Sequence, residues 1–241
     1  MTVKKLYVVG SGAMGSGIAQ TAATHGIQVI MNDINEEFVA KGYNKIKKSL
    51  EKAVTKGRMT EEAKEEALAN LTTTVSLEDA KDADFVIEAA SENKGIKLGI
   101  FKQLDKICKP EAILASNTSS LPITEIAAAT ERPDQVIGTH FFNPVPAMKL
   151  LEIVMGLQTS ETTYQAALAL GEQLEKVPVK AIDKGGFIVN RLIDPFINEA
   201  VFMLEEGVGT AEDIDNGCKF GLNHPMGPLA LGDMIGWDVM L

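Results

Sequence analysis

The sequence predicts an α/β fold, in which a doubly wound sheet over residues 1–184 is followed by a smaller all-helical domain over residues 185–241. Three observations lead to this prediction. Short apolar runs of strand length alternate with helical segments along most of the chain. A glycine-rich turn joins the first apolar run to the first helical segment. Beyond Gly185-Gly186 no convincing strand follows.

The composition excludes several classes of protein. The 241 residues are 45% hydrophobic and 23% charged, which excludes a disordered chain. No apolar stretch approaches the roughly 18 residues of a membrane-spanning helix, and no secretion signal is recognisable. Cys108 and Cys218 can form at most one disulfide, so we expect a protein of the reducing cytoplasm, and they lack metal-ligand spacing, so we expect no bound metal. The net charge of −10 argues against binding to nucleic acid or an anionic membrane.

The first elements form a βαβ unit. Residues 4–9 are predicted to be a buried strand, and a helix of small residues follows the glycine turn to about His25. Gly26 ends this helix, and a second apolar run follows at 27–31. Two parallel strands need a crossover of this kind.

The rest of the first domain continues the alternation. The charged region 36–70 has helical periodicity and breaks near Lys56-Gly57, which predicts two helices. Further helices are predicted at 94–107 and 162–174. Apolar runs predict strands at 85–87, 112–115, 136–142, 150–155 and 177–181.

The second domain is predicted to be helical over residues 187–218, with a kink or a short break at Pro195. The stretch 221–227 interrupts this region before a last apolar segment. The chain ends inside that segment, at 236–241, without a helix stop or a polar tail. We therefore expect this domain to be incomplete, as in a chain shortened at its C-terminus.

The glycine turn reads Gly10-Ser11-Gly12-Ala13-Met14-Gly15. Its glycines permit a tight turn, the approach of a pyrophosphate to the backbone, and close packing of helix and strand. Asp33 ends the second strand, close to the roughly 20-residue offset of a carboxylate that binds a ribose. The pattern predicts a dinucleotide, and the acid favours NAD over NADP. The alternative is a turn that only tightens the βαβ unit.

His140 is the candidate acid/base residue. It lies near the C-terminal end of the strand 136–142, where ligands bind in open α/β sheets. When a carbon loses or gains a hydride, the oxygen bonded to it must lose or gain a proton. An imidazole can accept or donate that proton near neutral pH. Glu152 interrupts the apolar run 150–154, and a buried carboxylate is costly unless it is paired. His140 is the expected partner, although it also fits a core histidine, and Glu152 also fits an edge position facing water.

Ser119 and Asn190 are further polar candidates. Ser119 lies in the loop 116–120 that follows a strand, and its hydroxyl can hold a substrate oxygen or cap the next helix. Asn190 is an amide among apolar residues at the start of the second domain. It can orient a reacting group or satisfy the local backbone.

Four motifs, in this order, resemble the L-3-hydroxyacyl-CoA dehydrogenase family: GSGAMGSGIAQ at 10–20, SNTSSL at 116–121, GTHFFNPVP at 138–146 and GGFIVNR at 185–191. The resemblance covers the whole chain and is closest to the short-chain bacterial members. It implies a Rossmann-like NAD-binding domain and a helical domain that completes the site and forms a homodimer. It also implies interconversion of (S)-3-hydroxybutyryl-CoA and acetoacetyl-CoA by hydride transfer. Family members extend beyond the position of Leu241, in line with a shortened chain.

The resemblance also implies roles for single residues. His140 is expected to be the general acid/base and Glu152 its orienting partner, with Ser119 and Asn190 around the reacting oxygen and the base. For NAD it implies Asp33 at the adenosine ribose, and these residues nearer the nicotinamide: Glu92, Lys97, Ser119 and Asn143.

For CoA the resemblance implies Ser49 and Lys56. Without the resemblance, Lys56 fits a surface lysine better than a phosphate ligand, and Lys97 also fits a solvated helix lysine. Two other functions stay open: an enzyme of this architecture that acts on a free hydroxy acid, and a noncatalytic NAD-binding protein. Binding of CoA would separate the first from the implied function, and the intact set of four catalytic candidates argues against the second.

Overall fold

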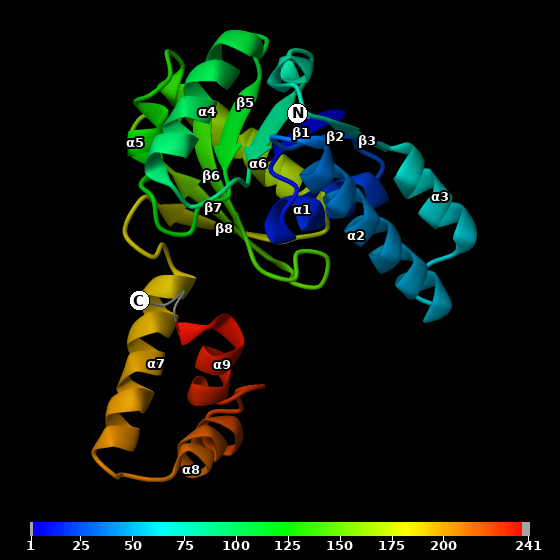
Figure 1. The fold of residues 1–241 in the computed structure, drawn as a ribbon. Helices are drawn as coiled ribbons and strands as arrows, with labels where there is room; N and C mark the ends of the chain where they lie inside the picture. Colours follow the sequence, from blue (N-terminus) through cyan, green and yellow to red (C-terminus); the bar gives the residue numbers. More distant parts are fainter. Residues whose placement is uncertain (1, 238–241) are drawn as a thin grey trace. The chain divides into compact units, whose positions relative to one another are not determined.

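The computed structural model describes residues 2–237, so the last part of the final apolar segment, 238–241, lies outside the described residues. The chain divides into two compact units, Met1–Gly185 and Gly186–Leu241. The first unit is α/β and the second is helical, which confirms the predicted fold class (Figure 1).

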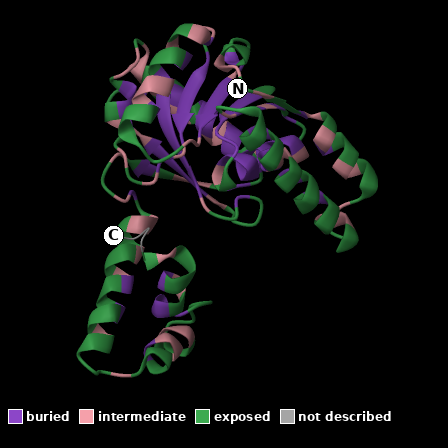
Figure 2. Ribbon diagram, in the orientation of Figure 1, coloured by how far each residue is buried: buried purple, intermediate pink, exposed green. Residues whose placement is uncertain are grey.

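Within the described residues, the first unit contains an eight-stranded sheet of order β3-β2-β1-β4-β5-β6-β7-β8. Neighbouring strands are parallel except for the antiparallel pair β6 and β7. The central strands are buried, as expected of a sheet covered on both faces (Figure 2). The strands are β1 (Lys5–Val9), β2 (Gln28–Asn32), β3 (Leu71–Thr74), β4 (Phe85–Glu88), β5 (Ile113–Ser116), β6 (Val136–Phe141), β7 (Leu150–Met155) and β8 (Val177–Ile182).

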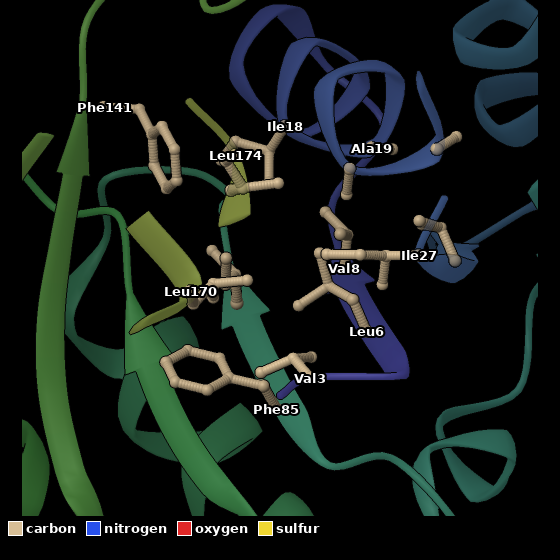
Figure 3. Packing of buried hydrophobic residues seen from close by; sticks show 14 of the residues in the cluster. Val3, Leu6, Val8, Ile18, Ala19, Ile27, Phe85, Phe141, Leu170 and Leu174 are labelled. Atoms are coloured by element: carbon tan, nitrogen blue, oxygen red, sulfur yellow. The ribbon is translucent and has the colours of Figure 1, made fainter. Parts of the chain in front are cut away.

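Helices connect most of these strands and cover the sheet. The main core lies under α1 and α6, where Val8 of β1, Ile18, Phe85 and Leu170 point toward one another (Figure 3). Burial of such side chains is the principal stabilising contribution in a domain of this size. The helices are α1 (Ala13–Thr24), α2 (Glu36–Thr55), α3 (Glu61–Ala69), α4 (Lys94–Ile107), α5 (Ile123–Ala127) and α6 (Glu161–Gln173), with short 3₁₀ turns at Leu77–Ala80 and Pro133–Gln135.

Most of these helices begin at a polar side chain that accepts a hydrogen bond from the first turn. Asn35, Thr60, Asn93 and Ser160 act in this way for α2, α3, α4 and α6. Helix α1 differs, because Gly12 precedes it without a side-chain cap and its first turn contains no acidic residue. The first N–H groups of α1 are therefore available for an anionic ligand.

The antiparallel pairing of β6 and β7 is a feature that the alternation of strands and helices does not predict. The connection over residues 142–149 contains no helix and is shorter than the dozen or so residues of a parallel crossover. Strand β7 therefore turns back along β6. The resulting register places His140 directly opposite Glu152.

The second unit contains α7 (Val189–Glu205), α8 (Ala211–Asn216), a π-helical turn (Gly217–Gly221) and α9 (Pro228–Ile235). Helix α7 continues through Pro195, so a break at this residue is wrong, and a kink there stays a prediction. A proline removes one backbone donor, and the turns beyond it still pack Ala200 against Ile214 and Leu229. Among the described helices, none combines the length and the apolar character needed to cross a bilayer.

Candidate active site

The glycine loop between β1 and α1 has the geometry of a phosphate-binding turn. Gly10 has a φ of +97°, and a Cβ there would lie 2.5 Å from the carbonyl oxygen of Ala89. A Cβ on Gly15 would lie 1.8 Å from the carbonyl oxygen of Gly10, so the helix approaches the loop closely. A Cβ on Gly12 would meet no atom within 4 Å. The backbone at Gly12 is thus open to an approaching ligand, as binding of the NAD pyrophosphate requires.

Asp33 borders this loop from the end of β2. Its Oδ2 accepts hydrogen bonds from the backbone N–H of Ser11 at 2.7 Å and from the Ser11 hydroxyl at 2.6 Å. Its Oδ1 accepts the N–H of Ile34 at 2.8 Å. A carboxylate at this place suits a ribose with free hydroxyls and disfavours an additional phosphate. The loop, the uncapped start of α1 and Asp33 together fit NAD.

His140 and Glu152 form a buried pair. Because directly opposed residues of antiparallel strands project from the same face, the two side chains meet. His140 Nδ1 lies 2.7 Å from Glu152 Oε2, and the two residues are 6% and 0% exposed. The water-facing alternative for Glu152 is therefore wrong. The hydrogen bond to the carboxylate fixes the orientation of the imidazole.

Ser119 lies in a loop that other polar groups hold in place. Helix α5 begins at Ile123 after Pro122, so Ser119 does not cap it. The Ser119 backbone N–H donates to Glu92 Oε1 at 3.0 Å. The side chain of Asn117, two residues earlier, accepts the N–H of Phe141 at 3.0 Å, which ties this loop to β6.

Lys97 and Glu92 form part of the same arrangement. Lys97 Nζ lies 3.2 Å from Glu92 Oε2, and the lysine is only 1% exposed, so it is not a solvated surface residue. Burial alone would raise the pKa of Glu92. The hydrogen bond from Thr118 and the nearby Lys97 ammonium outweigh burial, and the pKa lies below its usual value. Glu92 is therefore ionised at neutral pH and holds both Lys97 and the loop of Ser119.

A basic cleft of about 570 Å³ lies between α1, α2 and the loop after β6. Ser49 and Lys56, the residues implied for CoA, both line it. The other cations that line the cleft were not predicted from the sequence: Lys45, Lys52 and Arg58. No acidic residue lines the cleft in the part of the chain that the structure describes. An overall acidic chain thus carries a local site for an anionic ligand.

The loop after β6 links this cleft to His140. Asn143 borders the cleft only three residues after His140, a span of at most about 11 Å of extended chain. Lys176 holds the loop from behind, because its buried ammonium donates to the carbonyls of Val145 at 2.6 Å and Met148 at 2.8 Å. Burial lowers the pKa of Lys176.

The remaining candidate, Asn190, lies in the first turn of α7 in the second unit. Its role beside His140 stays a prediction.

Comparison with known proteins gives a consistent picture. Residues 5–184 match the model of the 3-hydroxyacyl-CoA dehydrogenase NAD binding domain, and residues 186–241 match that of the 3-hydroxyacyl-CoA dehydrogenase C-terminal domain. A probable 3-hydroxybutyryl-CoA dehydrogenase of Bacillus subtilis is 51% identical over 100% of this chain and 84% of its own length. A 3-hydroxybutyryl-CoA dehydrogenase of Clostridioides difficile is 50% identical over 98% of this chain and 84% of its own. The crystal structure of (S)-3-hydroxybutyryl-CoA dehydrogenase from Ralstonia eutropha superposes with a TM-score of 0.97, at 49% identity over 99% of this chain and 84% of that one.

Proposed function

Because the chain belongs to the 3-hydroxyacyl-CoA dehydrogenase family and is an NAD-dependent oxidoreductase, we propose that it interconverts (S)-3-hydroxybutyryl-CoA and acetoacetyl-CoA. The observation that carries the proposal is the buried contact of 2.7 Å between His140 and Glu152. His140 lies at the carboxyl end of β6, the strand that leads into the basic cleft, and Glu152 faces it from β7.

In this proposal His140 moves the proton. During oxidation of the alcohol, His140 accepts the proton of the 3-hydroxyl group while C3 loses a hydride, and the C3–O bond becomes a carbonyl. NAD, when bound, supplies the acceptor for that hydride. Because Nδ1 faces Glu152, the proposal assigns the proton transfer to the other ring nitrogen, Nε2. In the reverse direction the imidazolium returns the proton to the oxygen, and Glu152 stabilises the charged ring in both directions.

The other predicted residues position the reactants. Ser119 and Asn190 are proposed to hold the reacting oxygen and the imidazole. Glu92, Lys97 and Asn143 are proposed to lie toward the nicotinamide end of the cofactor. The contacts among Glu92, Lys97 and the Ser119 loop support a shared role for these groups.

The basic cleft is proposed to hold the phosphates of CoA. Lys45, Ser49 and Lys52 follow one another at spacings of four and three residues, so they share one face of α2, and Lys56 directly follows the end of that helix. Several cations on one face suit a ligand with several phosphate groups. A free hydroxy acid has a single carboxylate and lacks these phosphates.

Two assays test the proposal. Oxidation of NADH should proceed rapidly with acetoacetyl-CoA and only slowly with acetoacetate, which lacks the CoA phosphates. Lys56→Ala should raise the KM for acetoacetyl-CoA by about fivefold or more, or about 1 kcal/mol. Lys47→Ala is the matched control, because Lys47 is exposed on α2 but does not line the cleft. Equal rates with both substrates, or equal effects of both variants, would contradict the proposal.

We also propose a homodimer formed through the second unit and a cytoplasmic location. Large apolar side chains are exposed on that unit, among them Leu192 at 70% and Phe202 at 48%, which supports an interface there. Both cysteines are free thiols, which supports a reducing compartment. Light scattering at micromolar concentration should give twice the mass of the chain, whereas the mass of a single chain would contradict the dimer.

A further inference from the structure

The side chain of Glu88 lies at the centre of the polar network on the carboxyl edge of the sheet. Glu88 ends β4 and is fully buried. Its Oε1 accepts hydrogen bonds from the Lys97 ammonium and from the N–H of Ala90, both at 2.8 Å. Its Oε2 accepts hydrogen bonds from Lys97 at 3.0 Å and from the Ser116 hydroxyl at 2.7 Å. A buried carboxylate persists only with partners of this kind.

Two series of contacts connect Glu88 to Ser119, and the first runs through charged groups. Lys97, which Glu88 holds with both oxygens, also contacts Glu92 at 3.2 Å. Glu92 in turn accepts the backbone N–H of Ser119 at 3.0 Å. The ammonium therefore lies between two carboxylates, and Glu88 is the nearer and the more buried of them.

A second connection runs through neutral groups. The Ser116 hydroxyl donates to Glu88 and accepts the N–H of Thr118 at 3.2 Å, within the loop that leads to Ser119. Glu88 of β4 is in register with Ser116 of β5, and Ser116 is in register with Gly138 of β6, two residues before His140. Because side chains alternate along a strand, Glu88, Ser116 and His140 project from the same face of the sheet.

We infer that Glu88 is a positioning residue, which fixes the Lys97 ammonium and the Ser119 loop without touching substrate or cofactor. The inference rests on the proposed function for the roles of Lys97 and Ser119. Glu88→Gln keeps the size of the side chain but removes the negative charge that holds Lys97. The Lys97 ammonium can then move toward Glu92. The Ser119 loop thereby loses the Glu88 carboxylate as the group that holds it through Lys97 and Ser116.

Helix α4 offers a matched control, because a second ion pair holds its other end. Asp105 Oδ1 accepts a hydrogen bond from Arg132 Nε at 2.7 Å, and the two side chains are 10% and 15% exposed. Asp105→Asn therefore also removes a carboxylate from an ion pair of α4. It leaves the carboxyl edge of the sheet unchanged.

The test compares the two variants by steady-state kinetics with NADH and acetoacetyl-CoA, by thermal unfolding, and by hydrogen exchange of residues 116–121. Glu88→Gln should lower kcat by about tenfold or more and speed exchange in the loop. Asp105→Asn should lower the melting temperature but leave kcat within about twofold of the original chain. An unchanged kcat in Glu88→Gln, or equal losses in the two variants, would overturn the inference.

Two further measurements cover the remaining outcomes. If Glu88→Gln does not fold, Ser116→Ala removes only the neutral connection, and it should still lower kcat and speed loop exchange. Normal values of both in Ser116→Ala would then overturn the inference. If the original chain does not reduce acetoacetyl-CoA, the proposed function fails. Hydrogen exchange of residues 116–121 in Glu88→Gln then decides whether Glu88 fixes the loop.

Discussion

Gly12 separates two explanations of the glycine loop, a cofactor site and a turn that only tightens the βαβ unit. A Cβ on Gly12 would meet no atom within 4 Å, and the residue has a φ of −66°, which alanine adopts readily. Gly12→Ala should therefore change the free energy of unfolding by less than about 1 kcal/mol. The added methyl group occupies the space through which a pyrophosphate reaches the backbone. The dissociation constant for NADH should rise by about tenfold or more, or about 1.4 kcal/mol.

Gly15→Ala is the comparison for this prediction. Its Cβ would lie 1.8 Å from the carbonyl oxygen of Gly10, so backbone atoms must move. This variant should lose about 1–3 kcal/mol of stability or more, in addition to NADH affinity. Fluorescence titration with NADH and urea unfolding measure the two quantities separately. If Gly12→Ala binds NADH as tightly as the original chain, the pyrophosphate does not lie on this loop.

Three further predictions concern cofactor choice, pH and the cleft. NADH should exceed NADPH by about tenfold in kcat/KM, and Asp33→Ala should reduce this ratio; equal use of both cofactors by the original chain would contradict the role of Asp33. Burial alone would raise the pKa of Asp84, but hydrogen bonds from Lys109 and from two backbone N–H groups lower it. Ionised Asp84 therefore stabilises the fold above about pH 4, and this stabilisation is lost as the pH falls through the folded-state pKa of Asp84. Asp84→Asn should therefore lower the free energy of unfolding by about 1–3 kcal/mol at pH 7 and by progressively less in more acidic urea titrations, whereas a constant difference would contradict this assignment. Lys176→Met removes the donor that holds the loop after β6, and it should raise the KM for acetoacetyl-CoA by about threefold or more; an unchanged KM would show that the loop needs no such support.

The order of strands and helices in the first unit could be predicted because most of its strands are buried apolar runs that glycines and polar loops delimit. The strand β3 could not. Its sequence, Leu71-Thr72-Thr73-Thr74, contains a single large apolar residue, and it forms a strand by pairing with β2 at the edge of the sheet. Threonine is compatible with such a position because β-branched residues favour extended backbone.

The pairing of His140 with Glu152 was predicted from the energetic cost of a buried carboxylate. The reason that they meet, the antiparallel return of β7, depends on the short connection after Phe141 and was not predicted. The same energetic argument applies to Glu88, an acid directly after the apolar run 85–87, and would have indicated a buried partner for it.

The basic cleft could be predicted only in part from the sequence. Lys45, Lys52 and Lys56 carry a recognisable signal, because their spacing follows one face of α2 as far as Lys56, the residue directly after its end. Arg58 lies beyond the end of that helix and carries no such signal. Only the packing of α1, α2 and the loop after β6 brings it to the same cleft.

The most direct test of His140 as the general acid/base is the initial rate of NADH oxidation with saturating acetoacetyl-CoA, measured for the original chain and for His140→Gln. Glutamine keeps a polar side chain at this position but cannot exchange a proton near neutral pH. The original chain should turn over readily, and kcat should fall by about a hundredfold or more in the variant while NADH still binds within about twofold of its original affinity. A glutamine variant with near-normal kcat would contradict the assignment of proton transfer to His140.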